Sequence, residues 1–318
     1  MTHASPSPSP SSPSSHDHTH THTPGQGQGH GHAHTSGPAG SHDQAEILDL
    51  DADVLAEHTD SLTAWLPVTA APRRIVDLGC GTGAGTFALL ARFPDARVTA
   101  VDASAVHLDR LRERARELGL ADRVRTVRAD LDGEWPDLTG PDLAGPELVW
   151  ASASLHHMAD PGRTLRTVRG LLAPGGLFAV VELAGFPRFL PADAPRERPG
   201  LEDRCHAALA SRHTEHLPHR GADWGPELAA AGFTVEGERT IAVHVDGAGN
   251  GAVGRYALSS LGRLRDGAAA TLDARDLTAL ERLLDTGGPG SILRRDDLAV
   301  RTERTAWAAR AGASVRPA

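Results

Sequence analysis

Strand-like and helix-like segments alternate along the middle of the chain. Five apolar segments predict strands: "RRIVDLG", "ARVTAVD", "RVRTVRAD", "ELVWASAS" and "GLFAVVEL". Helical patterns lie between them, such as residues 105–118, where Leu108, Leu111, Ala115 and Leu118 form one apolar stripe. Repetition of this kind at about 25-residue intervals is typical of βαβ units, so the sequence predicts an α/β fold with a parallel sheet.

The two ends of the chain differ from this middle region. Residues 1–43 are rich in Ser, Pro and His with almost nothing apolar to bury, so we expect a disordered tail followed by one domain over 44–318. The alternating histidines from His16 to His34 could hold a divalent metal weakly, although a solvated tail is the plainer interpretation. The rhythm breaks after Leu183, and residues 184–226 and 247–296 are expected to form a helical cap.

The charge of the chain argues against a nucleic-acid partner. It carries 41 acidic and 32 basic residues, a net charge of -9, and no segment concentrates positive charge. Every basic residue is Arg, because Lys is absent. This excludes a P-loop lysine, a Schiff-base lysine and the Tyr-x-x-x-Lys pair of many short-chain dehydrogenases.

Cysteine usage and hydropathy predict a cytoplasmic protein. Cys80 and Cys205 lie far apart and outside any metal or redox spacing, so neither a disulfide framework nor a metal site is expected. No apolar run is long enough for a transmembrane helix, and the N-terminus lacks the pattern of a signal peptide, so no membrane partner is predicted.

A glycine-rich loop follows the first predicted strand. Gly79, Gly81 and Gly83 let backbone N–H groups approach a ligand at the start of the next helix. Gly79, Gly81 and Ala84 also satisfy G-x-G-x-x-A, the dinucleotide fingerprint. The loop alone therefore leaves two ligand classes open, a dinucleotide and S-adenosylmethionine.

Acidic residues at the ends of three successive strands favour S-adenosylmethionine. Asp77 precedes the first glycine, where its charge is unhelpful beside a pyrophosphate but favourable beside an ammonium and a sulfonium group. Asp102 ends the second strand and can accept both ribose hydroxyls, which suits either cofactor. Asp130 ends the third strand, where it can accept an adenine amino group beside the amide of Leu131.

Four motifs occur in order between Arg73 and Leu183: "VDLGCGTG", "VTAVDAS", "VRADL" and "ELVWASASLHHMADPGRTLRTVRGLLAPGGLFAVVEL". They resemble the class I S-adenosylmethionine-dependent methyltransferases, in particular the small-molecule branch with the ubiquinone and menaquinone C-methyltransferases. The resemblance implies a Rossmann-like, mostly parallel sheet of seven strands in the order 3-2-1-4-5-7-6, with strand 7 antiparallel, helices on both faces and a helical cap.

The resemblance and the strand-end acids together predict the residues that bind S-adenosylmethionine. These are Asp77, Gly79, Cys80, Gly81, Gly83, Asp102, Ala103, Asp130, Leu131 and Ala151.

The acceptor is expected to be a small molecule. "SASL" at residues 152–155 stands where enzymes that methylate adenine carry (Asn/Asp)-Pro-Pro-(Tyr/Phe), and neither cysteine fits a cytosine nucleophile. His156 and His157 follow the fourth strand at the ligand-binding edge and are candidate catalytic bases, although the recurrence of this pair across acceptors favours a structural role for at least one. His206, His213 and Trp224 in the cap are candidate acceptor contacts, the alternative being a cap that only excludes water.

Two other functions remain open at this point. The literal dinucleotide fingerprint allows a Rossmann-type NAD(P) oxidoreductase. A protein that keeps the cofactor fold without catalysis, and handles metal through its His-rich tail, is the second alternative.

Overall fold

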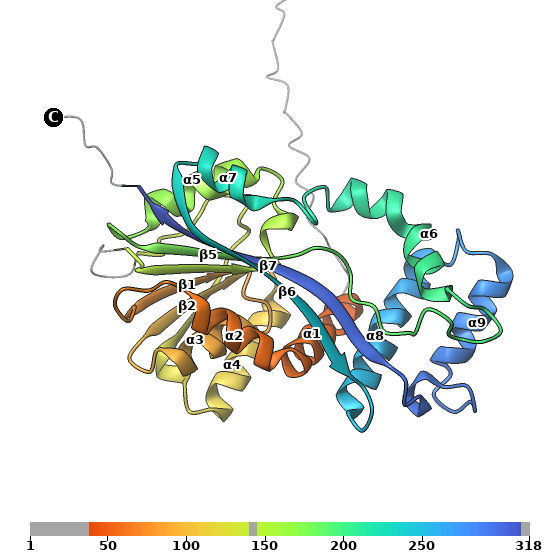
Figure 1. Cartoon of the computed structure of the whole chain (residues 1–318). Coiled ribbons are helices and arrows are strands. Elements are labelled where there is room, and N and C mark those ends of the chain that lie inside the picture. The colour runs from red at the N-terminus through yellow and green to blue at the C-terminus, as the bar shows by residue number, and fades with distance from the viewer. Residues whose placement is uncertain (1–37, 140–144, 313–318) are drawn as a thin grey trace, which may run out of the picture. The chain divides into compact units, whose positions relative to one another are not determined.

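The computed structural model describes residues 38–139 and 145–312. Their strands form one sheet in the order β3-β2-β1-β4-β5-β7-β6 (Figure 1). The strands are β1 (Arg74–Leu78), β2 (Arg97–Asp102), β3 (Val124–Arg128), β4 (Leu148–Ser152), β5 (Leu177–Leu183), β6 (Phe233–Asp246) and β7 (Ala299–Ala311). β1 to β5 pair in parallel, and β7 is antiparallel to β5 and β6. This confirms the predicted order and the antiparallel last strand.

Helices cover both faces of the sheet (Figure 1). α2 (Ala56–Trp65), α3 (Ala84–Arg92) and α4 (Ala105–Glu117) lie on one face, and α5 (Pro161–Leu171) and α7 (Trp224–Ala230) on the other. Short 3-10 turns occupy Ala121–Arg123, Leu155–His157 and Ile292–Arg294. α5 begins at a capped first turn, because the Asp160 side chain accepts from the Arg163 amide at 2.8 Å and Pro161 occupies the first turn.

β6 and β7 are about twice as long as the parallel strands and support a second hydrophobic cluster. α1 (Pro38–Val54), α6 (Leu201–His216), α8 (Gly251–Ala268) and α9 (Ala274–Leu284) contribute to this cluster, together with Val243 of β6 and Val300 of β7. α6 belongs to the first predicted cap segment, and α8 and α9 to the second. The predicted tail lies outside the described residues as far as residue 37, and residues 38–43 begin α1.

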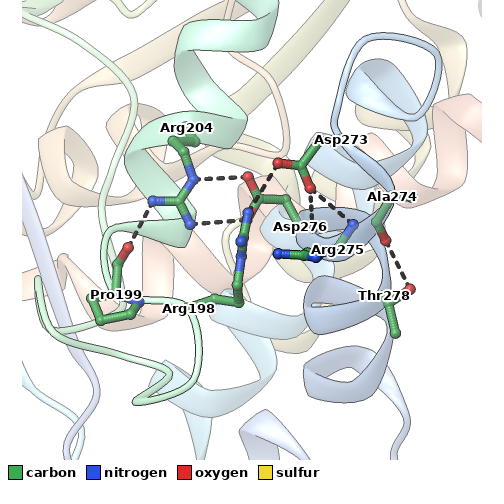
Figure 2. Close-up of polar contacts among 8 residues, drawn as sticks. All are labelled: Arg198, Pro199, Arg204, Asp273, Ala274, Arg275, Asp276 and Thr278. Carbon is green, nitrogen blue, oxygen red and sulfur yellow. Dashed lines mark hydrogen bonds and ion pairs between the residues drawn. The ribbon is translucent and has the colours of Figure 1, made fainter.

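A buried carboxylate joins the two cap segments (Figure 2). The Asp276 side chain on α9 is 3% exposed and accepts from Arg198 Nε at 2.7 Å and from Arg204 Nε at 2.8 Å. These bonds lower the pKa of Asp276, the one from Arg204 most. Asp273 caps α9 and also accepts from Arg198. The network therefore holds α9 against α6 and the loop before it.

Replacing Asp276 should loosen the cap. Asp276→Ala leaves two cations without their shared partner, and because both guanidinium groups are partly exposed we expect a loss of about 2 kcal/mol, below the range for a fully buried pair. Chemical denaturation would measure it. Asp266→Ala, which removes an exposed partner of Arg265, is the control and should cost less than about 0.5 kcal/mol. Equal losses in the two variants would contradict the importance of the buried network.

Candidate functional site

The glycine loop lies at the carboxyl end of β1 and packs against the turn after β4. Gly79, Gly81 and Gly83 all have positive φ angles, at 65°, 53° and 103°. A Cβ atom on Gly79 would lie 2.4 Å from the Cβ of Ser154, so only glycine fits at this position. The loop therefore packs closely against the turn after β4, and its glycines have no side chains to cover its backbone.

Asp77 is a buried carboxylate directly beneath this loop. Asp77 is only 2% exposed, and the hydroxyl of Thr86 on α3 donates to its carboxylate at 2.6 Å. Burial raises the pKa of Asp77 from 3.8 to about 7; the nearby charge of Asp102 adds to the rise, and the bond from Thr86 opposes it. The folded protein therefore stabilises the ionised form of Asp77 less well than water does.

Asp102 ties the glycine loop to the end of β2. Its carboxylate accepts from the Gly81 amide at 2.9 Å and the Ser104 amide at 2.8 Å, and His107 Nδ1 lies 3.3 Å away. A carboxylate has about four acceptor positions, so three are in use. One remains for a ligand hydroxyl, and a second becomes available if His107 turns away.

Asp130 and Leu131 lie on an anchored loop after β3. Asp130 is exposed, and its side chain accepts from the Asp132 amide at 3.0 Å. The carbonyl of buried Leu131 accepts from Trp135 Nε1 at 2.9 Å and from Arg163 of α5 at 3.0 Å. Trp135 and Arg163 were not among the predicted site residues, because nothing local in the sequence shows that either reaches this carbonyl.

The remaining predicted cofactor residues contribute mainly backbone to this edge. Cys80 is buried and its amide donates to the Val101 carbonyl at 3.0 Å. The Ala103 carbonyl accepts from Arg128 at 3.1 Å, and Ala151 is buried in β4 beside Leu78 of β1. The structure thus brings the predicted cofactor residues to the carboxyl ends of β1 to β4, and their binding role stays a prediction.

A second buried carboxylate shapes the turn after β4. Glu182 on β5 accepts from the amides of Ser154 at 3.1 Å and Leu155 at 2.8 Å. The residue before them, Ala153, has a φ of 51°, in the left-handed region that a non-glycine residue seldom adopts. Glu182 therefore stabilises a strained turn at the edge where ligands bind in open α/β sheets.

His156 has protein partners at both ring nitrogens. Its Nδ1 lies 2.6 Å from Glu182, and its Nε2 lies 3.0 Å from an Arg220 guanidinium nitrogen. Arginine has only donors, so Nε2 accepts and Nδ1 carries the proton that is donated to Glu182. His156 is 1% exposed, whereas His157 is exposed with its ring centre 4.2 Å from that of His156. The catalytic role of either histidine stays a prediction.

The first cap segment, residues 184–226, reaches His156 through a stack of planar groups. The Arg220 guanidinium lies 4.0 Å above the centre of the Phe186 ring, and this ring lies 5.8 Å from that of His206 on α6. His206 is thus linked to His156 through Phe186 and Arg220, and an acceptor contact by His206 stays a prediction. Neither Glu182 nor Arg220 was among the predicted site residues: Glu182 lies within a strand of the last motif, where nothing marks it as functional, and Arg220 lies outside the motifs.

The other two predicted acceptor contacts are placed differently. Trp224 at the start of α7 is buried in the core beneath that helix with Leu228 and Phe233. His213 lies on α6, but its side chain is outside the described part of the structure. An acceptor contact by either residue stays a prediction.

Helix α1 lies beside the glycine loop, since Leu48 Cδ1 is 3.1 Å from where a Cβ on Gly81 would stand. Asp51 on the same helix accepts from Arg304 of β7 at 2.7 Å and from the Tyr256 hydroxyl of α8 at 2.7 Å. Burial and the Asp51 charge raise the pKa of Tyr256. These contacts hold α1 between the glycine loop and the second cap segment.

Within residues 38–139 and 145–312, no three or more His, Cys, Asp or Glu side chains form a cluster suited to a metal. No helix of these residues is long and apolar enough to cross a membrane.

Comparisons with known proteins agree on one family. Residues 76–178 match the family described as "Methyltransferase domain". The 27-O-demethylrifamycin SV methyltransferase of Amycolatopsis mediterranei is 37% identical over 54% of this chain and 60% of its own length. The trans-aconitate 2-methyltransferase of Methylobacterium nodulans is 34% identical over 61% of this chain and 69% of its own length.

The fold has a counterpart among solved structures. A putative methyltransferase from Bacillus halodurans aligns with a TM-score of 0.50 and 16% identity, over 80% of this chain and 99% of its own. At this identity the likeness concerns the fold alone. The chain spans 60% of the rifamycin relative and smaller shares of several others, for example 42% of the trans-aconitate 2-methyltransferase of Paracidovorax citrulli.

The raised pKa of Asp77 should make the stability of the ligand-free protein depend on pH. The folded protein keeps this proton up to about pH 7, whereas the unfolded chain releases it near pH 3.8. The protonated Asp77 therefore contributes fully to the stability of the folded protein below pH 3.8. As the pH rises to about 7, this contribution is lost and the free energy of unfolding falls by about 4 kcal/mol.

Asp77→Asn should remove this loss and be more stable than wild type at pH 8. Denaturation curves from pH 4 to 8 would test this, with exposed Asp109→Asn as the control that retains the wild-type dependence. If the free energy of unfolding changed with pH in the same way in wild type and in Asp77→Asn, the pKa of Asp77 would not be raised in the folded protein.

Proposed function

The chain belongs to the class I S-adenosylmethionine-dependent methyltransferases, and on that premise we propose that it methylates a small-molecule acceptor. The observation that carries the proposal is the set of three acids at the carboxyl ends of β1, β2 and β3. Among the described residues no cation pairs with buried Asp77. Asp102 retains acceptor capacity, and Asp130 is exposed beside the anchored Leu131.

These residues fit the chemical groups of S-adenosylmethionine. The molecule carries an ammonium and a sulfonium group, two ribose hydroxyls and an adenine amine. We expect the first two to lie toward Asp77, the hydroxyls toward Asp102 and the amine toward Asp130. When bound, the cofactor supplies an electrophilic methyl group, and positioning and exclusion of water provide much of the rate.

The parts of this chain that exclude water are α1 and the cap. Leu48 contacts the glycine loop, and the bonds of Asp51 to Arg304 and Tyr256 hold its helix in place. The Arg220–Phe186–His206 stack covers the turn after β4. An acceptor bound between these segments would be held near the β4 edge and away from bulk solvent.

The relatives support a small molecule as the acceptor. Their names specify 27-O-demethylrifamycin SV and trans-aconitate, both small molecules. We infer a cytoplasmic location, which suits two buried, unpaired cysteines, and incidental metal binding by the His-rich tail, which lies largely outside the described residues.

Methyl transfer itself is tested with labelled cofactor. Protein incubated with S-adenosyl-[methyl-³H]methionine and a panel of carboxylates, phenols and aliphatic alcohols, including trans-aconitate and 27-O-demethylrifamycin SV, should label at least one acceptor. Calorimetry that compares the affinities for S-adenosylhomocysteine and for NADH distinguishes a methyltransferase from the alternative, an NAD(P) oxidoreductase. Preferential binding of NADH would overturn the proposal.

Asp102→Ala should weaken S-adenosylhomocysteine binding at least tenfold. The variant loses charge-assisted bonds of about 1.5–3 kcal/mol each to the ribose, and it also frees the Gly81 amide that fixes the loop. Asp109→Ala, on the exposed side of α4, is the matched control and should bind normally. Unchanged affinity in Asp102→Ala would show that the ribose is held elsewhere.

S-Adenosylhomocysteine and S-adenosylmethionine should bind more weakly below pH 7. Their ammonium group interacts with ionised Asp77, and in the free protein this residue is protonated below about pH 7, so binding must release a proton. Calorimetry in two buffers of different ionisation enthalpy measures that release. Asp77→Asn should bind weakly at every pH and release no proton; proton release equal to wild type would show that another group titrates.

A further inference from the structure

The environment of His156 points to a role other than acid–base chemistry. A general base must present a free acceptor nitrogen to the substrate proton. In this structure Nε2 already accepts from Arg220, Nδ1 donates to Glu182, and the residue is 1% exposed. Three further bonds hold the system, since Glu182 also accepts two amides of the turn and Ser154 Oγ donates to the Leu78 carbonyl at 2.9 Å.

Arg220 is the only member of this arrangement that belongs to the cap. It lies between α6 and α7, and burial lowers its pKa while the charge of Glu182 opposes that effect. One edge of its guanidinium bonds to His156, and its face stacks on Phe186, which contacts His206. Arg220 therefore connects two cap elements to one fixed point on the core.

The residues that follow Arg220 form the wall of a pocket. Gly221, Ala222 and Asp223 line a cavity of about 200 Å³, whose other wall includes Glu182 of β5 and Trp307 of β7. This wall therefore follows directly in the chain from Arg220, the cap residue that bonds to His156.

We propose that His156 is a positioning residue, which fixes the first cap segment over the carboxyl end of β4 through its bond to Arg220. Glu182 sets the tautomer, His156 presents Nε2 as the acceptor, and Arg220 transmits that position to Phe186 and to the 221–223 wall. The relevance of this anchor to an acceptor rests on the proposed function, whereas the anchor itself is a property of the folded chain.

Hydrogen exchange on the full-length protein tests the anchor without any acceptor. Arg220→Met keeps most of the side-chain volume but removes the donor, so amides in residues 184–226 should exchange about tenfold faster. Residues 74–102 should exchange as in wild type. Arg196→Met removes an exposed arginine of the same segment and is the matched control, with exchange expected within about twofold of wild type.

Two substitutions at His156 separate an anchor from a residue that merely fills space. Gln offers one acceptor and one donor atom at a similar spacing, so His156→Gln should exchange nearly as wild type in 184–226. His156→Ala should exchange as fast as Arg220→Met. Unchanged exchange in Arg220→Met, or equal acceleration in His156→Gln and His156→Ala, would overturn the proposal.

Calorimetry with S-adenosylhomocysteine on the same variants keeps the two hypotheses apart. Arg220→Met should bind it within about twofold of wild type, because its contacts lie on the β4–β5 side of the glycine loop. Loss of binding in this variant alone would place Arg220 in the cofactor site and overturn the anchor. A wild-type protein that fails to bind would instead refute the proposed function, while the exchange results would still decide the anchor.

Discussion

The buried carboxylate of Glu182 organises both halves of the candidate site. A charge so enclosed needs strong hydrogen bonds, and Glu182 obtains them from two backbone amides and from His156. The amide bonds hold the turn after β4, and Ser154 in that turn is the residue against which Gly79 packs. The bond to His156 leads outward to Arg220 and the cap. The packing of the glycine loop and the position of the first cap segment therefore both depend on the side chain of Glu182.

Much of the sheet was predictable because its signals are local. Each parallel strand is an apolar run followed by a turn, and the acids at residues 77, 102 and 130 follow from the position of the strand ends. The order of the strands came from the resemblance, since periodicity alone does not specify neighbours. The role of Glu182 was not predictable, because its contacts are not local in the sequence. Within "GLFAVVEL" it is one polar residue in a buried strand, and its partners lie 26 to 28 positions earlier.

The cap was predicted as a break in the rhythm, but the contacts of its side chains were not. Trp224 was expected to face the acceptor because it is aromatic and lies in the cap segment. It occupies the first turn of α7, whose inner face packs on the sheet, so its ring is buried with Phe233. Arg220, four residues earlier in an irregular turn, faces His156 instead. Which residue of an irregular segment turns inward depends on tertiary contacts that no short sequence pattern records.

The two buried carboxylates illustrate different physical solutions. Glu182 accepts hydrogen bonds from two backbone amides and from His156, so the ligand-free chain itself supplies its partners. Asp77 has the Thr86 hydroxyl as its side-chain donor and a second acid nearby, and its pKa rises to about 7. Hydrogen bonds within the fold thus stabilise the framework, while the charge left uncompensated at Asp77 lowers stability at neutral pH and favours a cationic ligand. The raised pKa of this carboxylate fits its proposed role toward a cationic group of the ligand.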